Sequence, residues 1–214
     1  MIVTRILIAL NIAAFFVEIV TLGPGILSGN VSMQGLLNDG ALVPLAVTQY
    51  HEYWRLVTAA FLHLGLLHIG VNMFSLWMLG RFIEPVVGSW RMAVIYVFSM
   101  LVSSLGVVYF SGPGDLTVGA SGAIFGIFGA LFAIGFKFGP RGMQLVRDNL
   151  GILLVNLIIT FAVPGISKAA HVAGLAAGFL LTLAIYFPPR PIRTRVVDAN
   201  TGQEIASEFE TPSA

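Results

Sequence analysis

The chain has no cysteine and few charged residues among its 214 positions. The absence of cysteine excludes disulfides, a thiolate zinc site and a cysteine nucleophile. Charged side chains make up 10% of the sequence, where a soluble globular domain carries roughly 25%. The formal net charge is +1, so there is no basic field for binding nucleic acid. So few charges could not cover a soluble protein of this size, and we expect the chain to reside in a lipid bilayer.

Apolar residues are abundant instead, at 57% of the chain with a mean hydropathy of +0.92. A helix needs roughly 20 apolar residues to cross the hydrocarbon core of a membrane. Six stretches meet or approach that length: about 2–21, 61–79, 92–110, 121–138, 150–163 and 169–187. The sequence therefore predicts an all-α membrane protein, with a six-transmembrane-helix bundle over residues 1–187. We expect it to be a multi-pass protein of the cell membrane, of the prokaryotic inner-membrane kind.

Lysine and arginine are distributed unevenly over the segments that join these stretches. If the N-terminus is cytoplasmic, nine of the eleven basic residues lie on the cytoplasmic side: Arg5, Arg81, Arg91, Lys137, Arg141, Arg147, Arg190, Arg193 and Arg195. Arg55 and Lys168 then lie outside. Because cytoplasmic segments carry an excess of basic residues, the sequence predicts that both termini are cytoplasmic (N-in/C-in).

Two segments are not expected to span. Residues 22–60 are too apolar for a free linker and end in an amphipathic cluster around Trp54 and Arg55, which suits the level of the lipid headgroups. We expect them to form a structured loop in the outer interface. Residues 188–214 begin with prolines and continue with a thin mixture of charges, and we expect a disordered cytoplasmic tail.

Polar side chains inside apolar spans are costly and need a reason. The fourth span opens with Gly119-Ala120-Ser121-Gly122, and His171 lies near the start of the sixth. In the predicted topology both spans enter the membrane from the same side, so Ser121 and His171 lie at similar depth. A hydroxyl becomes a good nucleophile when a nearby base removes its proton. The pair is therefore a candidate nucleophile and base.

Glycines on the same two spans would allow the helices to approach closely. Gly122 follows the serine, while Gly174 and Gly178 lie three and seven residues after the histidine, on one helical face. Packing along these glycines would bring His171 to Ser121. The residues alone also allow another interpretation, in which two glycine-faced helices pack together and the buried serine bonds its own backbone.

His68 and Asn72 are four residues apart and share a face of the second span. Each side chain can donate a hydrogen bond, and the N–H groups at the start of a helix add further donors. Together these are the components of an oxyanion hole, although an ordinary interhelical hydrogen-bonded pair is the alternative. Glu84 lies at the cytoplasmic end of the second span, and Glu18, near the outer end of the first, is expected to be a plain interfacial residue without a role. A Ser-His dyad is therefore the most these residues support. We expect no metal, because an asparagine is a poor ligand and no further ligand completes the set, and no cofactor.

In this order the residues resemble those of the rhomboid intramembrane serine proteases. The likeness covers about residues 35–187. It depends on four elements: His63, His68 and Asn72 after Trp54-Arg55; Leu79-Gly80 before Glu84; Gly119-Ala120-Ser121-Gly122; and Ala170-His171 with Gly174 and Gly178.

The resemblance implies that Ser121 is the nucleophile, that His171 is the base, and that His68 and Asn72 stabilise the oxyanion. It implies an endopeptidase that hydrolyses peptide bonds in or near transmembrane segments of its membrane-protein partners. One departure is Phe125, which stands where many relatives have tyrosine. A proteolytically inactive rhomboid-like protein that binds client helices is the alternative. A small transporter would need polar residues spread through the spans, or an inverted repeat, and the sequence has neither. The oligomeric state stays open.

Overall fold

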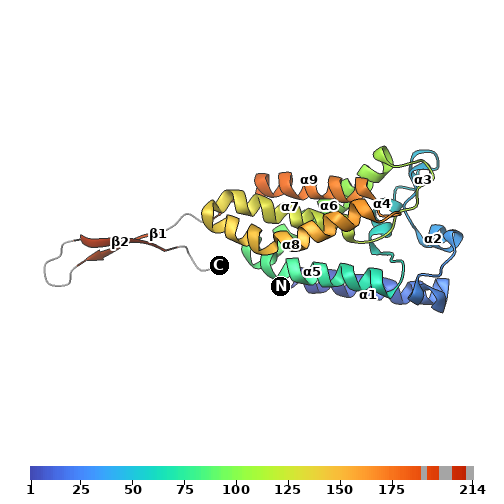
Figure 1. Cartoon of the computed structure of the whole chain (residues 1–214), viewed down its shortest axis with the longest axis horizontal. Helices are drawn as coiled ribbons and strands as arrows, with labels where there is room; N and C mark the ends of the chain where they lie inside the picture. Colours follow the sequence, from blue (N-terminus) through green and yellow to red (C-terminus); the bar gives the residue numbers. More distant parts are fainter. Residues whose placement is uncertain (189–191, 198–203, 211–214) are drawn as a thin grey trace.

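The structure, a computed structural model, describes residues 1–188, 192–197 and 204–210. Within these residues it contains six helices long and apolar enough to cross a membrane, which confirms the expected six-helix bundle. The helices are α1 (Val3–Leu22), α5 (Leu66–Val87), α6 (Ser89–Phe110), α7 (Ser121–Phe138), α8 (Pro140–Ala162) and α9 (Lys168–Ile185). They lie roughly side by side in one elongated bundle (Figure 1).

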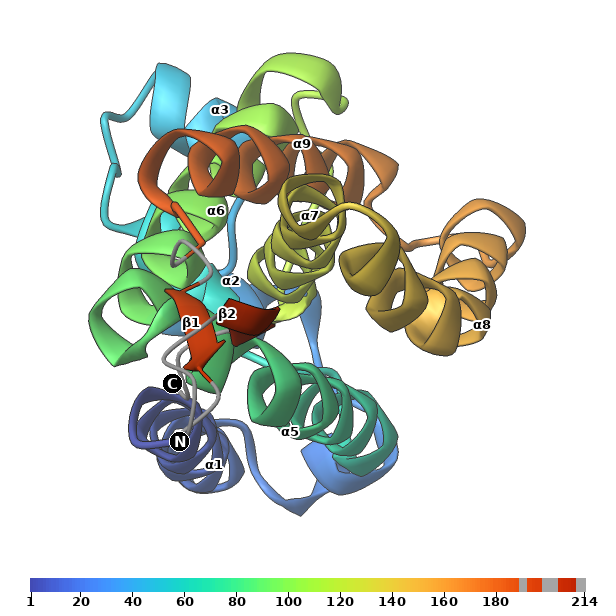
Figure 2. The same cartoon turned by 90° about the vertical axis from the view of Figure 1, so that its left-hand side faces the viewer.

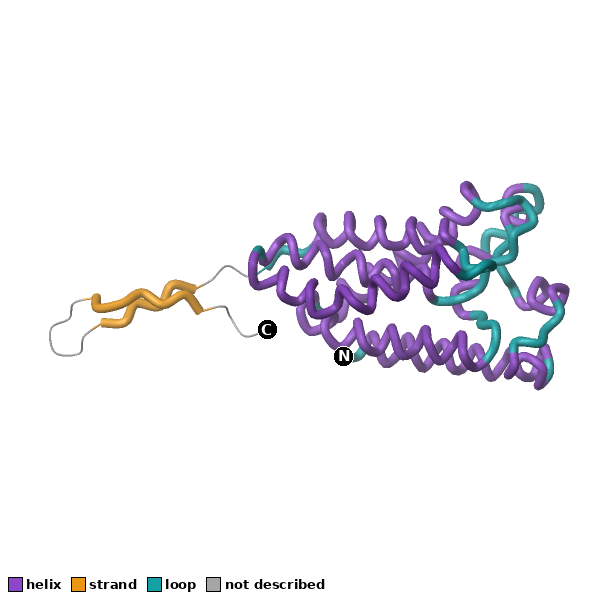
Figure 3. Tube along the Cα trace, viewed as in Figure 1, coloured by secondary structure: helices purple, strands orange, loops and turns teal. Residues whose placement is uncertain are grey.

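The bundle has two unlike ends. α1 begins and α9 ends at the same end, which we call the termini end (Figure 1). Residues 23–65 and 111–120 lie at the opposite end, which we call the loop end (Figure 3). An even number of crossings places both termini on one side of the membrane. Which side that is stays a prediction from the basic residues.

Two helices differ from their predicted bounds. The second span is predicted at 61–79, but α5 runs from Leu66 to Val87. The fifth is predicted at 150–163, but α8 begins at Pro140. In both cases polar residues lower the mean hydropathy of one helix end, so an apolar-run criterion does not include that end in the span. Arg81 and Glu84 lie in the last turns of α5, and exposed Arg147 lies in the second turn of α8. Proline at the first position of a helix is favourable, since its missing N–H would have no partner there.

The loop end is built from short helices: η1 (Pro24–Ser28), α2 (Met33–Asp39), α3 (Pro44–Thr48), α4 (Arg55–Thr58) and η2 (Ala59–Phe61). Arg55 holds this segment together. The residue is 7% exposed, and one guanidinium nitrogen donates to the carbonyl oxygens of Leu37 at 2.7 Å and Ala41 at 2.8 Å. Its Nε donates to the Glu52 carboxylate at 2.5 Å. The segment is therefore structured, while its expected position in the outer interface stays a prediction.

α7 occupies the middle of the bundle. Viewed end-on, it lies among α5, α6, α8 and α9 (Figure 2). A Cβ built on Gly174 of α9 would lie 2.0 Å from the carbonyl oxygen of Gly122 on α7, and one on Gly178 would lie 1.9 Å from that of Gly126. Any side chain at these positions would separate the two helices, so the glycines set how closely α9 approaches α7.

At the termini end, Glu84 closes the start of α1. Its carboxylate accepts backbone N–H bonds from Ile2 at 2.7 Å, Val3 at 3.0 Å and Thr4 at 2.9 Å. It also accepts the hydroxyls of Thr4 at 2.6 Å and Ser89 at 2.8 Å. The first N–H groups of a helix have no partner within the helix, and α1 has no side-chain cap of its own. A carboxylate from α5 therefore does the work of a local cap and complements the helix dipole.

The C-terminal segment differs from the expectation of disorder. Strands β1 (Ile192–Val197) and β2 (Glu204–Glu210) pair antiparallel, with Ile192 opposite Glu210. The β-branched residues of the first strand favour extended backbone, a preference that a reading based on charge and proline content does not weigh. The rest of 189–214 lies outside the described residues, and the cytoplasmic location of this segment stays a prediction.

Candidate active site

Ser121 is the first residue of α7 and follows a sharp turn at Gly119. Gly119 has φ +120°, a region that favours glycine, and its N–H donates to the Ala59 carbonyl at 2.8 Å. A Cβ on Gly119 would lie 2.9 Å from His68 Nε2 and 3.9 Å from Ser121 Oγ. The missing side chain therefore lets His68 approach the serine. The turn at Gly119 presents the hydroxyl at the start of a helix, where free N–H groups gather.

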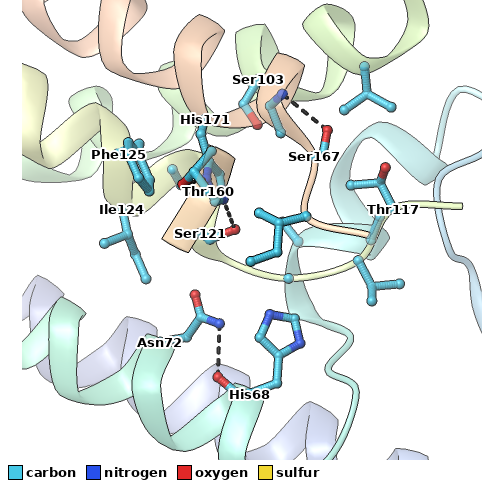
Figure 4. Close-up of a pocket in the computed structure, with 18 of the residues that line it drawn as sticks. His68, Asn72, Ser103, Thr117, Ser121, Ile124, Phe125, Thr160, Ser167 and His171 are labelled. Carbon is cyan, nitrogen blue, oxygen red and sulfur yellow. Dashed lines mark hydrogen bonds between the residues drawn. The ribbon is translucent and has the colours of Figure 1, made fainter. Parts of the chain in front are cut away.

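His171 lies one turn into α9 and is 6% exposed. Ser167 caps this helix by accepting the Ala170 N–H at 3.2 Å. The Nε2 atom of His171 lies 2.7 Å from Ser121 Oγ, within hydrogen-bond distance (Figure 4). The two residues are 50 positions apart, and the glycine contacts between α7 and α9 bring them together.

The imidazole of His171 is held on two further sides. The ring of Phe125, one turn after Ser121 on α7, stacks on it with centroids 4.1 Å apart and planes 13° apart. On the far edge, Nδ1 lies 2.7 Å from the Thr160 hydroxyl of α8 (Figure 4). Sequence reasoning missed Thr160, because nothing in the sequence distinguishes it from any other threonine in an apolar helix.

His68 and Asn72 lie on α5, across the cavity from the dyad (Figure 4). The Leu64 N–H donates to His68 Nδ1 at 3.1 Å, so the proton of the neutral ring is on Nε2. Asn72 donates one amide N–H to the His68 carbonyl at 2.9 Å, and its second amide hydrogen is available. Within the described residues, no hydrogen bond joins either side chain to Ser121 or His171. Both groups are therefore spare donors that face the dyad.

A cavity of about 360 Å³ separates the two sides, and its lining includes Ser121, His171, His68, Asn72 and Thr160. Polar groups from α5, α7, α8 and α9 thus converge on one space at the loop end of the bundle. In the described part of the chain, no three metal-ligating side chains lie close enough together to hold a metal ion.

His63 and Glu18 support the loop that leads to His68. Glu18 is 1% exposed, and its carboxylate accepts the His63 backbone N–H at 2.9 Å. Burial, and next the neighbouring His68, lower the pKa of His63 to about 3, so this ring stays neutral. Its ring meets that of His68 edge-on, with centroids 5.1 Å apart. Sequence reasoning gave Glu18 no role, because the backbone N–H that it accepts belongs to a residue 45 positions away.

Known proteins resemble this chain in sequence. The family model for the Rhomboid domain matches residues 50–187. Rhomboid protease GluP of Bacillus subtilis is 32% identical over 186 residues, which is 86% of this chain and 35% of that protein. Rhomboid protease GlpG of Yersinia enterocolitica is 33% identical over 154 residues, which is 68% of this chain and 55% of that protein.

A third relative is closer in size. Putative rhomboid protease YdcA of Bacillus subtilis is 35% identical over 133 residues, which is 61% of this chain and 66% of that protein. The chain thus spans about a third of GluP and about half of GlpG. Because the family model covers more than half of the chain, including both helices of the serine–histidine pair, this multi-pass membrane protein belongs to the rhomboid family.

Proposed function

We propose that this protein is an intramembrane serine endopeptidase that hydrolyses peptide bonds in or near the transmembrane segments of other membrane proteins. The observation that carries the proposal is the 2.7 Å contact between Ser121 Oγ and His171 Nε2 beside a cavity within the bundle that side chains of His68 and Asn72 also line. An unpaired hydroxyl and an imidazole would be costly inside a membrane, and as a pair they form a nucleophile and its base.

The reaction follows from this geometry. His171 Nε2 takes the hydroxyl proton while Ser121 Oγ bonds the scissile carbonyl carbon. The oxyanion that forms would accept hydrogen bonds from His68 Nε2–H, the second Asn72 N–H and the Ser121 backbone N–H. The imidazolium then gives its proton to the leaving amine. A water molecule in the cavity, deprotonated by the same histidine, hydrolyses the acyl-enzyme and releases Ser121.

The location of the cavity constrains the substrate and the source of water. The loop end lies opposite the termini, and nine of the eleven basic residues belong to the termini end or the tail. We therefore propose cytoplasmic termini and a cavity that receives water from the outer side. A substrate helix must unwind locally to expose its amide, so Gly or Pro near its outer end should speed cleavage. In a helix Gly costs about 1 kcal/mol and Pro about 3 kcal/mol relative to Ala.

The test uses the full chain, reconstituted in proteoliposomes with a single-span reporter protein. We expect cleavage by the wild type and none by Ser121→Ala, with a cut site toward the outer side by mass mapping. A fluorophosphonate should label wild type but not Ser121→Ala. If a folded wild type neither cleaves nor reacts, the alternative function, a proteolytically inactive rhomboid-like protein that binds client helices, replaces this one. A cut site on the cytoplasmic side would refute the orientation alone.

A further inference from the structure

The Thr160 hydroxyl lies between two hydrogen-bond partners. Its Oγ1 is 2.7 Å from His171 Nδ1 and also 2.7 Å from the carbonyl oxygen of Asn156, one turn earlier on α8. Thr160 is 1% exposed, and the ring of His171 is almost as buried. Since Thr160 itself is almost fully buried, these two partners decide where its hydroxyl proton points.

The number of available protons fixes which group donates in each hydrogen bond of the series Asn156, Thr160, His171 and Ser121. The Asn156 carbonyl oxygen can only accept, so the Thr160 hydroxyl donates to it. The oxygen of Thr160 then accepts, and the proton between it and His171 belongs to Nδ1. A neutral imidazole has one N–H, which leaves Nε2 unprotonated and able to accept the Ser121 hydroxyl hydrogen.

We propose that Thr160 is a positioning residue that holds His171 in the tautomer protonated on Nδ1, so that Nε2 serves as the base for Ser121. This inference rests on the proposed function. Within the described residues, neither an Asp nor a Glu is hydrogen-bonded to His171. Thr160 would therefore take the orienting role that a carboxylate has in a Ser-His-Asp triad. The opposite tautomer would place a proton on Nε2, facing Ser121, and the histidine could not act as a base.

Local structure keeps the threonine in this role. A β-branched side chain in a helix has few χ1 rotamers, and one of the two that threonine adopts lets its hydroxyl bond the carbonyl one turn back. The stack of Phe125 on the imidazole restricts how the ring can tilt, so its edge stays directed at Thr160. α8 packs mainly against α7, and Thr160 forms a hydrogen bond from α8 to the histidine of the dyad.

The size of the effect follows from the kind of bond. Loss of a carboxylate that orients a catalytic histidine lowers kcat by about 10⁴. A neutral hydroxyl stabilises the imidazolium less, and a neutral hydrogen bond shifts an equilibrium by roughly a factor of 3–10. We therefore expect removal of the Thr160 hydroxyl to lower kcat by about tenfold, with KM little changed, because the substrate does not touch this atom.

The experiment compares three variants with the wild type. Thr160→Val keeps the shape and removes the hydroxyl, whereas Thr160→Ser keeps the hydroxyl. Thr182→Val is the matched control, since Thr182 is a fully buried threonine on α9 whose hydroxyl has no partner among the described residues. We expect Thr160→Val to lose about tenfold in kcat, and Thr160→Ser and Thr182→Val to stay near the wild type.

A spectroscopic measurement separates this role from a merely structural one. ¹⁵N NMR of histidine-labelled protein should show the His171 proton on Nδ1 in the wild type. In Thr160→Val it should show a mixture with the Nε2 form. The signals are assigned by their absence in His171→Ala.

The inference is wrong if Thr160→Val keeps wild-type turnover, if Thr160→Ser loses as much as Thr160→Val, or if the ring signals are the same in wild type and Thr160→Val. A wild type that neither cleaves nor reacts with a fluorophosphonate would instead overturn the proposed function. The NMR comparison would still decide whether Thr160 sets the tautomer.

Discussion

The two walls of the cavity satisfy their polar groups in different ways. On the dyad wall, formed by α7, α8 and α9, side chains bond one another between helices, as in the contacts of His171 with Ser121 and Thr160. On the α5 wall, His68 accepts a nearby backbone N–H and Asn72 donates to its own helix. In the proposed reaction, the dyad wall would thus be assembled before a substrate arrives, and the α5 wall would keep free donors for the oxyanion that forms later.

The two walls also pack differently. α7 is buried over 72% of its length, and glycines let α9 approach it closely. α5 is buried over 39% of its most apolar stretch, and a Cβ on its Gly70 would meet nothing within 4 Å. Distances between groups on the dyad wall are therefore set by backbone contacts. α5 approaches α1 closely at Gly80, where an added Cβ would collide with the side chain of Thr4. Gly80 lies about two turns beyond Asn72 on α5, away from the cavity.

The largest expected effect is on the dyad wall. Ser121→Ala and His171→Ala should each lower kcat by on the order of 10⁴ or more, because a nucleophile and its base act as one unit. Circular dichroism should show a folded helical protein in both cases, and rates of reporter cleavage measure the loss. Turnover at the wild-type rate in Ser121→Ala would contradict the assignment of the dyad.

The next effect tests the free donors of the α5 wall. His68→Ala and Asn72→Ala should each lower kcat by roughly 10²–10³, the usual cost of one oxyanion donor. The loss should be larger for His68, whose Nε2–H lies close to Gly119. Ser99→Ala, a buried serine on α6 that does not line the cavity, is the control and should cleave normally. If both donor variants keep full turnover on several substrates, the α5 wall has only a structural role.

A third comparison concerns packing rather than chemistry. A Cβ on Gly178 would lie 1.9 Å from the Gly126 carbonyl oxygen, so Gly178→Ala should lower the free energy of unfolding by about 1–3 kcal/mol. Gly70→Ala on the α5 wall should leave it unchanged or raise it by up to about 1 kcal/mol, because alanine favours a helix. Unfolding in detergent micelles measures both. Equal stabilities would mean that α9 does not depend on close approach to α7.

The smallest effect should come from the aromatic support of His171. Phe125→Leu removes a stacked ring pair that contributes about 0.5–1.5 kcal/mol, so kcat should fall by about 2–10-fold. Phe125→Tyr keeps the stacking and should stay near the wild type. Cleavage rates under identical conditions compare the two. A larger loss for the tyrosine than for the leucine would show that the phenol hydroxyl disturbs the dyad wall.

Local patterns were sufficient to predict most of the architecture. Runs of apolar residues predicted six spans, and the motifs around Ser121 and His171 pointed to the family that the comparisons identify. The same patterns misjudged the start of α8 and the end of α5. A hydropathy average cannot distinguish a polar helical turn at the membrane surface from a loop. The strands of the C-terminal segment were missed because low hydrophobicity and charge were weighed above strand propensity.

The sequence by itself was sufficient to predict a membrane protein with six spans. It also predicted a serine and a histidine near the starts of two spans that enter the membrane from the same side. These properties depend on neighbouring residues and their spacing, which the linear order contains. Only the tertiary structure decided which distant groups meet. Glu84 caps a helix 80 residues earlier in the chain, and Glu18 supports the His63 loop. Thr160 contacts His171 across a turn between two helices. A threonine in an apolar helix has no pattern of its own, and its partner is set by the angle at which two helices pack.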